Sequence, residues 1–138
     1  MDGEDFYAAG FRGGATYHAV WGAAAIAFPA LPRLILHVQG EGAAVLLATA
    51  GALALASAYA CRVAASDPRR HRELASVILL ANALIAIVCG WNAALGVLLP
   101  EALWILVPGA LWLPFFAAFL RWERRSRMAQ LIARAGMG

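Results

Sequence analysis

Four long apolar segments alternate with short polar segments along the chain. The apolar segments are residues 14–38, 43–65, 74–99 and 102–121. Each approaches or exceeds the roughly 20 helical residues that cross about 30 Å of hydrocarbon. Strands are disfavoured, because the segments lack the polar and apolar alternation of a membrane barrel. The pattern therefore predicts an all-α integral membrane protein with four transmembrane helices.

The polar connections between these segments are short. Residues 39–42 and 100–101 form tight turns, and residues 66–73 form a strongly polar, basic loop. Short loops make consecutive helices antiparallel, so we expect one domain, residues 1–138, built as an up-down-up-down bundle. In the central loop, Ser66 or Asp67 is placed to cap the third helix, with Pro68 at its first position.

Arginine is concentrated at one end of the predicted bundle. All eleven basic residues are arginine, and all except Arg33 fall on the side that holds both termini and the central loop. The positive-inside rule therefore predicts a multi-pass protein of a bacterial-type inner membrane, with both termini in the cytoplasm. Contacts with lipid headgroups are expected from Arg62, Arg69, Arg70, Arg72, Arg121, Arg124 and Arg125.

The C-terminal tail, residues 122–138, continues this basic character. Its sequence from 121 to 134 is RWERRSRMAQLIAR, in which Met128, Leu131 and Ile132 share one side of a helix. A basic amphipathic helix of this kind binds anionic lipid surfaces or partner proteins. We expect the tail to lie on one of these two.

Composition supports a lipid environment. Apolar residues make up 63% of the chain and charged residues 14%, against roughly 45–50% and about 25% in soluble domains. A chain this short has too little interior to bury so much apolar surface. The net charge of +3 does not indicate a nucleic-acid partner, because the arginines flank apolar segments rather than forming a soluble basic face.

Small and polar residues within the segments predict how the helices pack. Helices in lipid associate through close backbone approach and hydrogen bonds. His18 lies between two small residues, Gly14 and Gly22, on one face of the first segment, and Asn82 begins a similar face on the third. The second segment carries a ladder of small side chains at every fourth position: Ala44, Ala48, Ala52, Ala56, Ala60 and Ala64.

Two pairs of polar residues on the second and third segments lie at matching depths. Ser57 and Asn82 are both about 12 Å from the cytoplasmic ends by helical rise. Thr49 and Asn92 match in the same way nearer the outer side. We expect at least one of these pairs to form a hydrogen bond between the two helices.

A few residues are candidates for ligand binding. His18 is the one histidine well inside a segment, where it is either a structural residue or a ligand to a cofactor. Asn82 and Asn92 are interhelical clamps or line a pocket. Trp112 lies between Pro108 and Pro114, which are expected to kink the fourth helix and open a crevice. Metal-ligand spacing and catalytic motifs are missing from the sequence, so no catalytic or metal-binding residue is assigned.

The layout resembles the DoxX-like group of small four-helix bacterial membrane proteins. The resemblance rests on Ala27-Phe28-Pro29 within the first segment, the small residues of the second, and the loop sequence from Ala65 to His71 (ASDPRRH). The chain departs from the pattern at Ser66, where an arginine is expected, and at Asn82, where a basic residue is expected. The resemblance implies a four-helix membrane architecture and quinone-linked oxidation or small-molecule handling, with no catalytic residue carried over.

Three functions are compatible with these features. A lack of converging reactive groups favours a non-catalytic inner-membrane subunit or accessory protein that packs with partner membrane proteins or with itself. The alternative is a membrane-embedded binder of quinone, lipid or pigment, or a redox accessory subunit, with its ligand beside His18 and Asn82. The second alternative is a small transporter. It lacks the intramembrane carboxylate of proton-coupled exporters, because no Asp or Glu falls within a segment.

Overall fold

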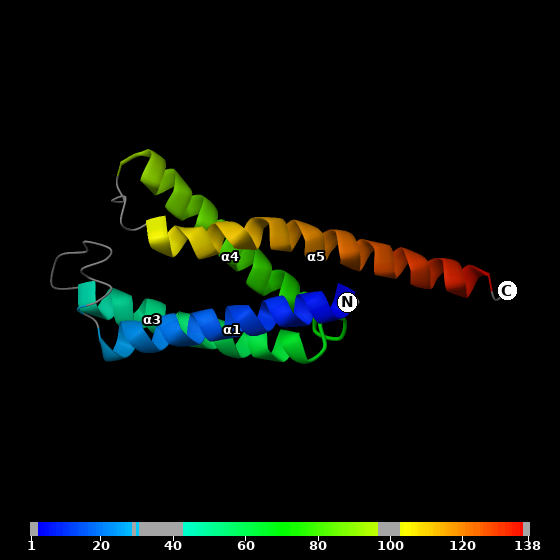
Figure 1. The fold of residues 1–138 in the computed structure, drawn as a ribbon, viewed down its shortest axis with the longest axis horizontal. Helices are drawn as coiled ribbons and strands as arrows, with labels where there is room; N and C mark the ends of the chain where they lie inside the picture. The colour runs from blue at the N-terminus through cyan, green and yellow to red at the C-terminus, as the bar shows by residue number, and fades with distance from the viewer. Residues whose placement is uncertain (1–2, 29, 31–42, 97–102, 137–138) are drawn as a thin grey trace.

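The residues that the structure describes fold into four α-helices. The computed structural model describes residues 3–28, 30, 43–96 and 103–136, with the side chains of residues 43, 46 and 103–110 left out. No strand occurs in these ranges, so the all-α fold class is confirmed. Consecutive helices run in opposite directions (Figure 1). The helices are α1 (Gly3–Ala27), α3 (Ala43–Ser66), α4 (Arg72–Ala94) and α5 (Leu103–Ala135).

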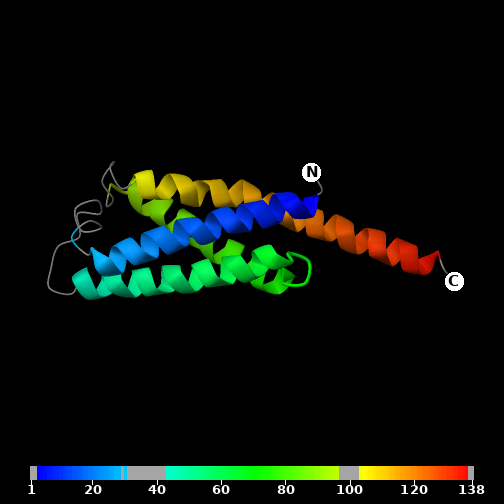
Figure 2. The same cartoon turned by 60° about the horizontal axis from the view of Figure 1, so that its bottom comes forward.

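One end of the bundle, which we call the arginine-rich end, holds the start of α1, the turn between α3 and α4, and the C-terminal part of α5 (Figures 1 and 2). α1 begins at Gly3, well before the segment that starts at residue 14. Glu4 and Asp5 lie in its first turn, where carboxylates interact favourably with the positive end of the helix dipole. Residues 31–42 and 97–102, which include Arg33 and two predicted turns, lie outside the described residues.

The fourth segment and the tail form one helix. α5 runs for 33 residues without a break, past both Pro108 and Pro114. Its C-terminal part projects beyond the other helices (Figure 1). Met128, Leu131 and Ile132 are exposed there, with 54–68% of their surface accessible. The predicted amphipathic tail is therefore the C-terminal part of α5, which we call the α5 extension.

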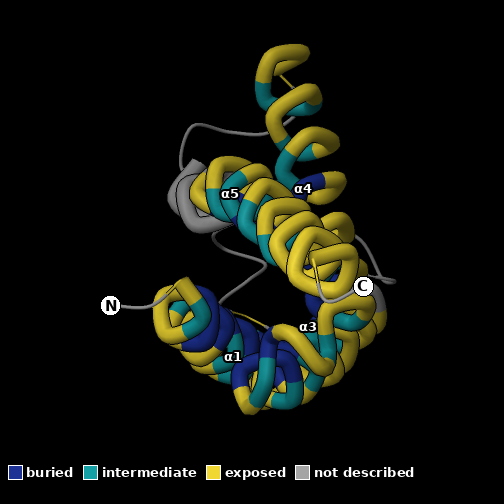
Figure 3. Tube along the Cα trace, turned by 90° about the vertical axis from the view of Figure 1, so that its right-hand side faces the viewer, coloured by how far each residue is buried: buried dark blue, intermediate teal, exposed yellow. Residues whose placement is uncertain are grey.

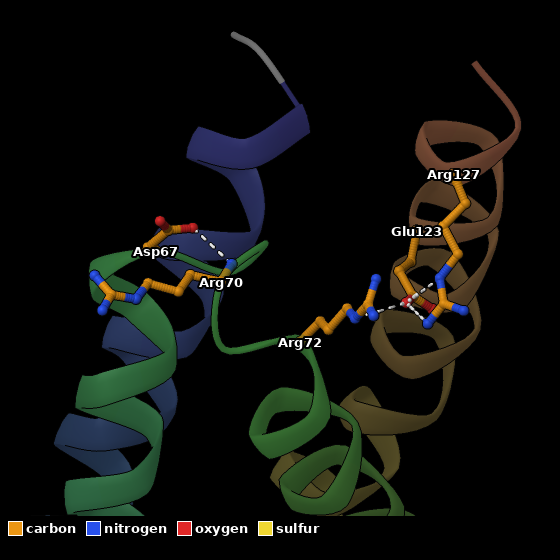
Figure 4. Close-up of polar contacts among 5 residues, drawn as sticks. All are labelled: Asp67, Arg70, Arg72, Glu123 and Arg127. Atoms are coloured by element: carbon orange, nitrogen blue, oxygen red, sulfur yellow. Dashed lines mark hydrogen bonds and ion pairs between the residues drawn. The ribbon is translucent and has the colours of Figure 1, made fainter. Parts of the chain in front are cut away.

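The turn between α3 and α4 differs from the predicted helix cap. α4 begins at Arg72 with His71 as its N-cap, and no side chain caps it. Asp67 instead closes the preceding turn, because its Oδ1 accepts a hydrogen bond of 2.8 Å from the backbone N–H of Arg70 (Figure 4). Asp and Asn side chains commonly stabilise turns in this way. Pro68 therefore lies in the turn, four residues before the helix begins.

The core lies in the half of the bundle nearest the arginine-rich end. Aromatic rings from α1 and α5 meet there edge to face: Phe11 lies 5.6 Å from Phe115 and 5.9 Å from Phe119, and Tyr7 lies 5.4 Å from Phe119. Edge-to-face pairs add stability beyond the area they bury. Phe11 and Phe119 are fully buried, so these rings join α1 to α5.

α1 approaches α3 more closely than it approaches α5. A Cβ added to Gly22 would lie 2.7 Å from the carbonyl oxygen of Gly51, and one added to Gly51 would lie 2.9 Å from that of Gly22. The two backbones are therefore in direct contact, which only glycine permits. Gly14, His18 and Gly22 are all buried, as predicted for that face of the first segment.

Only one end of the alanine ladder of α3 lies on the inner face, where Ala64 is fully buried. Ala52 and Ala56 are exposed, whereas Leu47, Gly51 and Ala58 are buried. The reason is geometric: four residues turn a helix by about 400°, so a strict four-residue ladder drifts by about 40° at each step. Over five steps the ladder winds to the opposite side of the helix.

α4 lies against its neighbours only near its beginning. Its buried residues end at Ala83, and its far end diverges from α1 and α3 (Figures 1 and 3). Residues 84–94 of α4 are largely exposed. Ile87, Val88 and Trp91 have 56–66% of their surface accessible. The bundle is therefore open at the end away from the core.

Two helices are long and apolar enough to cross a membrane, judged on the described residues. They are Leu47–Ser66 within α3 and Arg72–Ala94, the whole of α4. Only 33% and 28% of the most apolar stretch of each is buried. Both helices therefore present apolar side chains mainly outward.

Candidate ligand-binding cavity

A cavity of about 280 Å³ lies among all four helices, where the core ends and α4 begins to diverge. α3 contributes four residues with the spacing i, i+3, i+4 and i+7, and α4 contributes five with the spacing i, i+1, i+4, i+5 and i+8, so each set lies on one face of its helix. Exposed Leu53 and Ile85 mark the side on which the cavity opens, between α3 and α4. The lining residues are Tyr17, His18, Trp21, Ala50, Leu53, Ala54, Ser57, Ala81, Asn82, Ile85, Ala86, Cys89 and Trp112.

Two buried polar side chains, His18 and Asn82, face this apolar cavity. Each is 8% exposed. The Nε2 atom of His18 is the one buried side-chain nitrogen or oxygen without a hydrogen-bond partner in the described part of the chain. A buried polar atom left unpaired costs about 1–3 kcal/mol. Asn82 lies near the imidazole, but it leaves this nitrogen atom unsatisfied.

The polar residues of α3 and α4 bond to their own helices. The amide nitrogen of Asn82 donates to the carbonyl of Ile78 at 2.8 Å, and the hydroxyl of Ser57 donates to the carbonyl of Leu53 at 2.9 Å. Thr49 and Asn92 likewise donate to carbonyls one turn earlier. The expected bond between α3 and α4 is not found among the described residues; each of these four side chains instead donates one hydrogen bond within its own helix.

Trp112 closes the cavity from α5. Its ring is nearly parallel to the imidazole of His18, with an angle of 22° and 6.4 Å between ring centroids. Gly14 makes this position possible, because a Cβ there would lie only 2.4 Å from the indole. The indole therefore rests on the backbone of α1 and holds α5 beside the cavity.

The structure brings together three of the four ligand candidates: His18, Asn82 and Trp112. The fourth, Asn92, is half-buried on α4 and does not line the cavity. Sequence reasoning missed Trp21 and Cys89 as lining residues. Each lies one or two turns from a candidate on the same helix face, at i+3 from His18 and i+7 from Asn82, and this spacing is the signal that could have found them.

The lining of the cavity is mostly apolar, with a few polar groups. It includes one imidazole, one amide, the hydroxyls of Tyr17 and Ser57, a thiol and two indoles, and is otherwise apolar. In the ranges that the structure describes, no three His, Cys, Asp or Glu residues come together as a metal site. An apolar cavity with a few polar groups is the usual form of a small-molecule site.

Two of the predicted headgroup residues, Arg69 and Arg72, form ion pairs within the chain. Arg69 lies 2.9 Å from Glu4 and stacks over the ring of Trp122 at 5.6 Å. Arg72 lies 4.0 Å from Glu123, which also accepts a hydrogen bond from Arg127 (Figure 4). These contacts connect the central turn to α1 and α5. They are exposed and contribute little energy individually.

Comparison with known proteins adds no assignment. No family model matches the chain, and neither a curated protein nor a solved structure matches it. The resemblance to the DoxX-like group therefore stays a prediction.

Proposed function

We propose that the chain is an integral inner-membrane protein with four transmembrane helices and its arginine-rich end in the cytoplasm. The outward apolar side chains of α3 and α4 support this, since little of either helix is buried. The sequence of α5 from 103 to 120 contains no charged residue, and α1 has none between Gly13 and Ala27. The arginines at one end support the orientation.

Cysteine labelling tests this topology. In intact cells, Arg70→Cys in the central turn should resist a membrane-impermeant maleimide and should react after permeabilisation. Glu41→Cys, in the predicted turn on the other side, should react in intact cells and serves as the control. Native Cys61 is buried and Cys89 faces the cavity, so the parent protein gives the background. Labelling of Arg70→Cys from outside would reverse the orientation.

We further propose that the protein binds an amphipathic small molecule from the lipid phase, in the cavity beside His18. The observation that carries this proposal is the unpaired Nε2 atom of a histidine that is more than nine-tenths buried. A turn of the imidazole toward the cavity would bring this enclosed atom to a ligand hydroxyl, carbonyl or amide, and the tautomer that matches the ligand group would recover the lost hydrogen bond. The apolar and aromatic lining would accept the remainder, such as a quinone, a lipid or a pigment.

Replacing His18 with leucine should abolish retention of this ligand. Leucine fills similar volume without a polar atom, so the protein should also gain about 1 kcal/mol of stability in the absence of ligand. Native mass spectrometry of protein in lipid nanodiscs measures retention, and thermal unfolding measures stability. Asn92→Leu, outside the cavity, is the control and should keep the ligand. Equal retention of the ligand by His18→Leu would contradict the proposal. A wild-type cavity that holds only water molecules would contradict it as well.

A second candidate is a non-catalytic subunit that packs against partner membrane proteins or a second copy. The far half of α4 supports it, because Ile87, Val88 and Trp91 are exposed on a helix that diverges from the bundle. The same mass spectra would reveal a bound subunit. A monodisperse monomer with a retained small molecule would favour ligand binding instead.

A further inference from the structure

A groove crosses the α1–α3 interface at the arginine-rich end, apart from the His18 cavity. It encloses about 370 Å³. Each helix contributes three residues with the spacing i, i+3 and i+4, so one face of α1 lies opposite one face of α3. The lining residues are Arg12, Ala15, Thr16, Arg62, Ala65 and Ser66.

The groove places two arginines together without a carboxylate in its lining. Arg12 and Arg62 are both exposed, and neither takes part in an ion pair among the residues that the structure describes. Nearby Glu4 is paired with Arg69. Asp5 and Glu4 line an adjoining groove that shares Arg12, Ala65 and Ser66, but no ion pair joins Asp5 to Arg12 among the described residues. The guanidinium groups therefore remain available to an anion.

The hydroxyl groups of the groove are already used as donors. Thr16 donates to the carbonyl of Arg12 at 3.1 Å, and Ser66 donates to the carbonyl of Val63 at 2.7 Å. An anion would consequently be held by the guanidinium N–H groups. Guanidinium forms paired, charge-assisted hydrogen bonds with phosphate oxygens, which an ammonium group does not.

We propose that this groove binds the phosphate of an anionic phospholipid, with Arg12 and Arg62 on either side of it. The inference rests on the proposed membrane placement, in which Arg62 lies at the cytoplasmic boundary, four residues from the end of α3. Two positive charges around one phosphate favour a lipid without a cationic headgroup. Ala15 in the groove and Ala19 one turn further along α1 have small side chains, which leave room for the acyl chains.

The test compares two double variants that remove the same charge. Arg12→Gln/Arg62→Gln alters the groove, and Arg127→Gln/Arg134→Gln alters exposed arginines of the α5 extension that are not among the expected headgroup contacts. Native mass spectrometry measures the Kd of each protein for phosphatidylglycerol and for phosphatidylcholine in detergent micelles. Arg12→Lys/Arg62→Lys keeps the charge and removes the paired geometry. A further arm adds inorganic phosphate as a competitor.

Wild type should retain one phosphatidylglycerol at least tenfold more tightly than phosphatidylcholine. The groove variant should lose tenfold or more in affinity, because each arginine near the surface contributes about 1 kcal/mol and 1.4 kcal/mol is tenfold. The control should lose less than threefold, and the lysine variant should fall between them. Equal losses in both glutamine variants would mean diffuse attraction and would overturn the proposal.

Two other outcomes are distinguishable. Displacement of the lipid by millimolar inorganic phosphate would assign the groove to a soluble anion. The occupant of the His18 cavity is read from its own mass in the same spectra, so its loss or retention is scored independently. If the groove variant bound phosphatidylglycerol with wild-type affinity, the groove would not be the lipid-binding site.

Discussion

Gly22→Leu should separate α1 from α3 and destabilise the protein by about 3 kcal/mol, at the upper end of the usual cost of overpacking. Even the first carbon of the new side chain would lie 2.7 Å from the carbonyl oxygen of Gly51 and 2.9 Å from the Cγ of Leu55. Backbone atoms cannot move aside as a flexible side chain can. Denaturant unfolding of the protein in detergent, followed by circular dichroism, measures the change.

Gly13→Leu is the matched control for this prediction. It lies on the same helix, and a Cβ there meets nothing within 4 Å. Replacing glycine also removes a helix penalty of up to about 1 kcal/mol, so this variant should be as stable as wild type or slightly more so. Equal destabilisation of the two variants would show that the close contact with Gly51 does not hold the helices together.

Phe11→Ala should cost about 3 kcal/mol or more, the usual range for removing a buried phenylalanine. The side chain is fully buried and contacts Phe115 and Phe119 edge to face. Its loss would leave a cavity where α1 and α5 meet through aromatic rings. The same unfolding measurement applies.

Phe6→Ala provides the comparison on the same helix. Phe6 is 47% exposed and contacts Phe115 at 5.9 Å with a tilted ring. Its replacement should cost about 1 kcal/mol, since much of the ring is already outside the core. If Phe6→Ala were as costly as Phe11→Ala, the stability of this end would not depend on the buried ring cluster.

The candidate site was only partly predictable from the sequence. His18 and Asn82 stood out because polar residues inside apolar segments are rare and therefore informative. Trp21 and Cys89 gave no such signal. In a soluble helix a polar face shows which side is outward, but α3 and α4 are apolar all round. Apart from Asn82 and the face it marks, the residues of these two helices therefore could not indicate rotation, and rotation selects the lining of the cavity.

The hydrogen bonds of Ser57 and Asn82 were likewise only partly predictable from the sequence. Ser57 and Asn82 do reach the same cavity, as their matching depth suggested. Depth follows from residue count along a helix, which the sequence contains. The direction in which each side chain donates does not follow from residue count, because a carbonyl one turn earlier competes with the neighbouring helix for the same hydrogen. In both residues the local carbonyl is the acceptor.

The sequence by itself determined the four helices, their antiparallel order and the concentration of arginine at one end. These properties depend on local composition and on short connections, so they need no knowledge of packing. Tertiary structure decided which faces meet, that the core lies at the arginine-rich end, and that His18 faces a cavity with an unpaired nitrogen. The reason is that helix rotation is set by shape at a few contacts, above all Gly22 against Gly51 and the indole of Trp112 on Gly14.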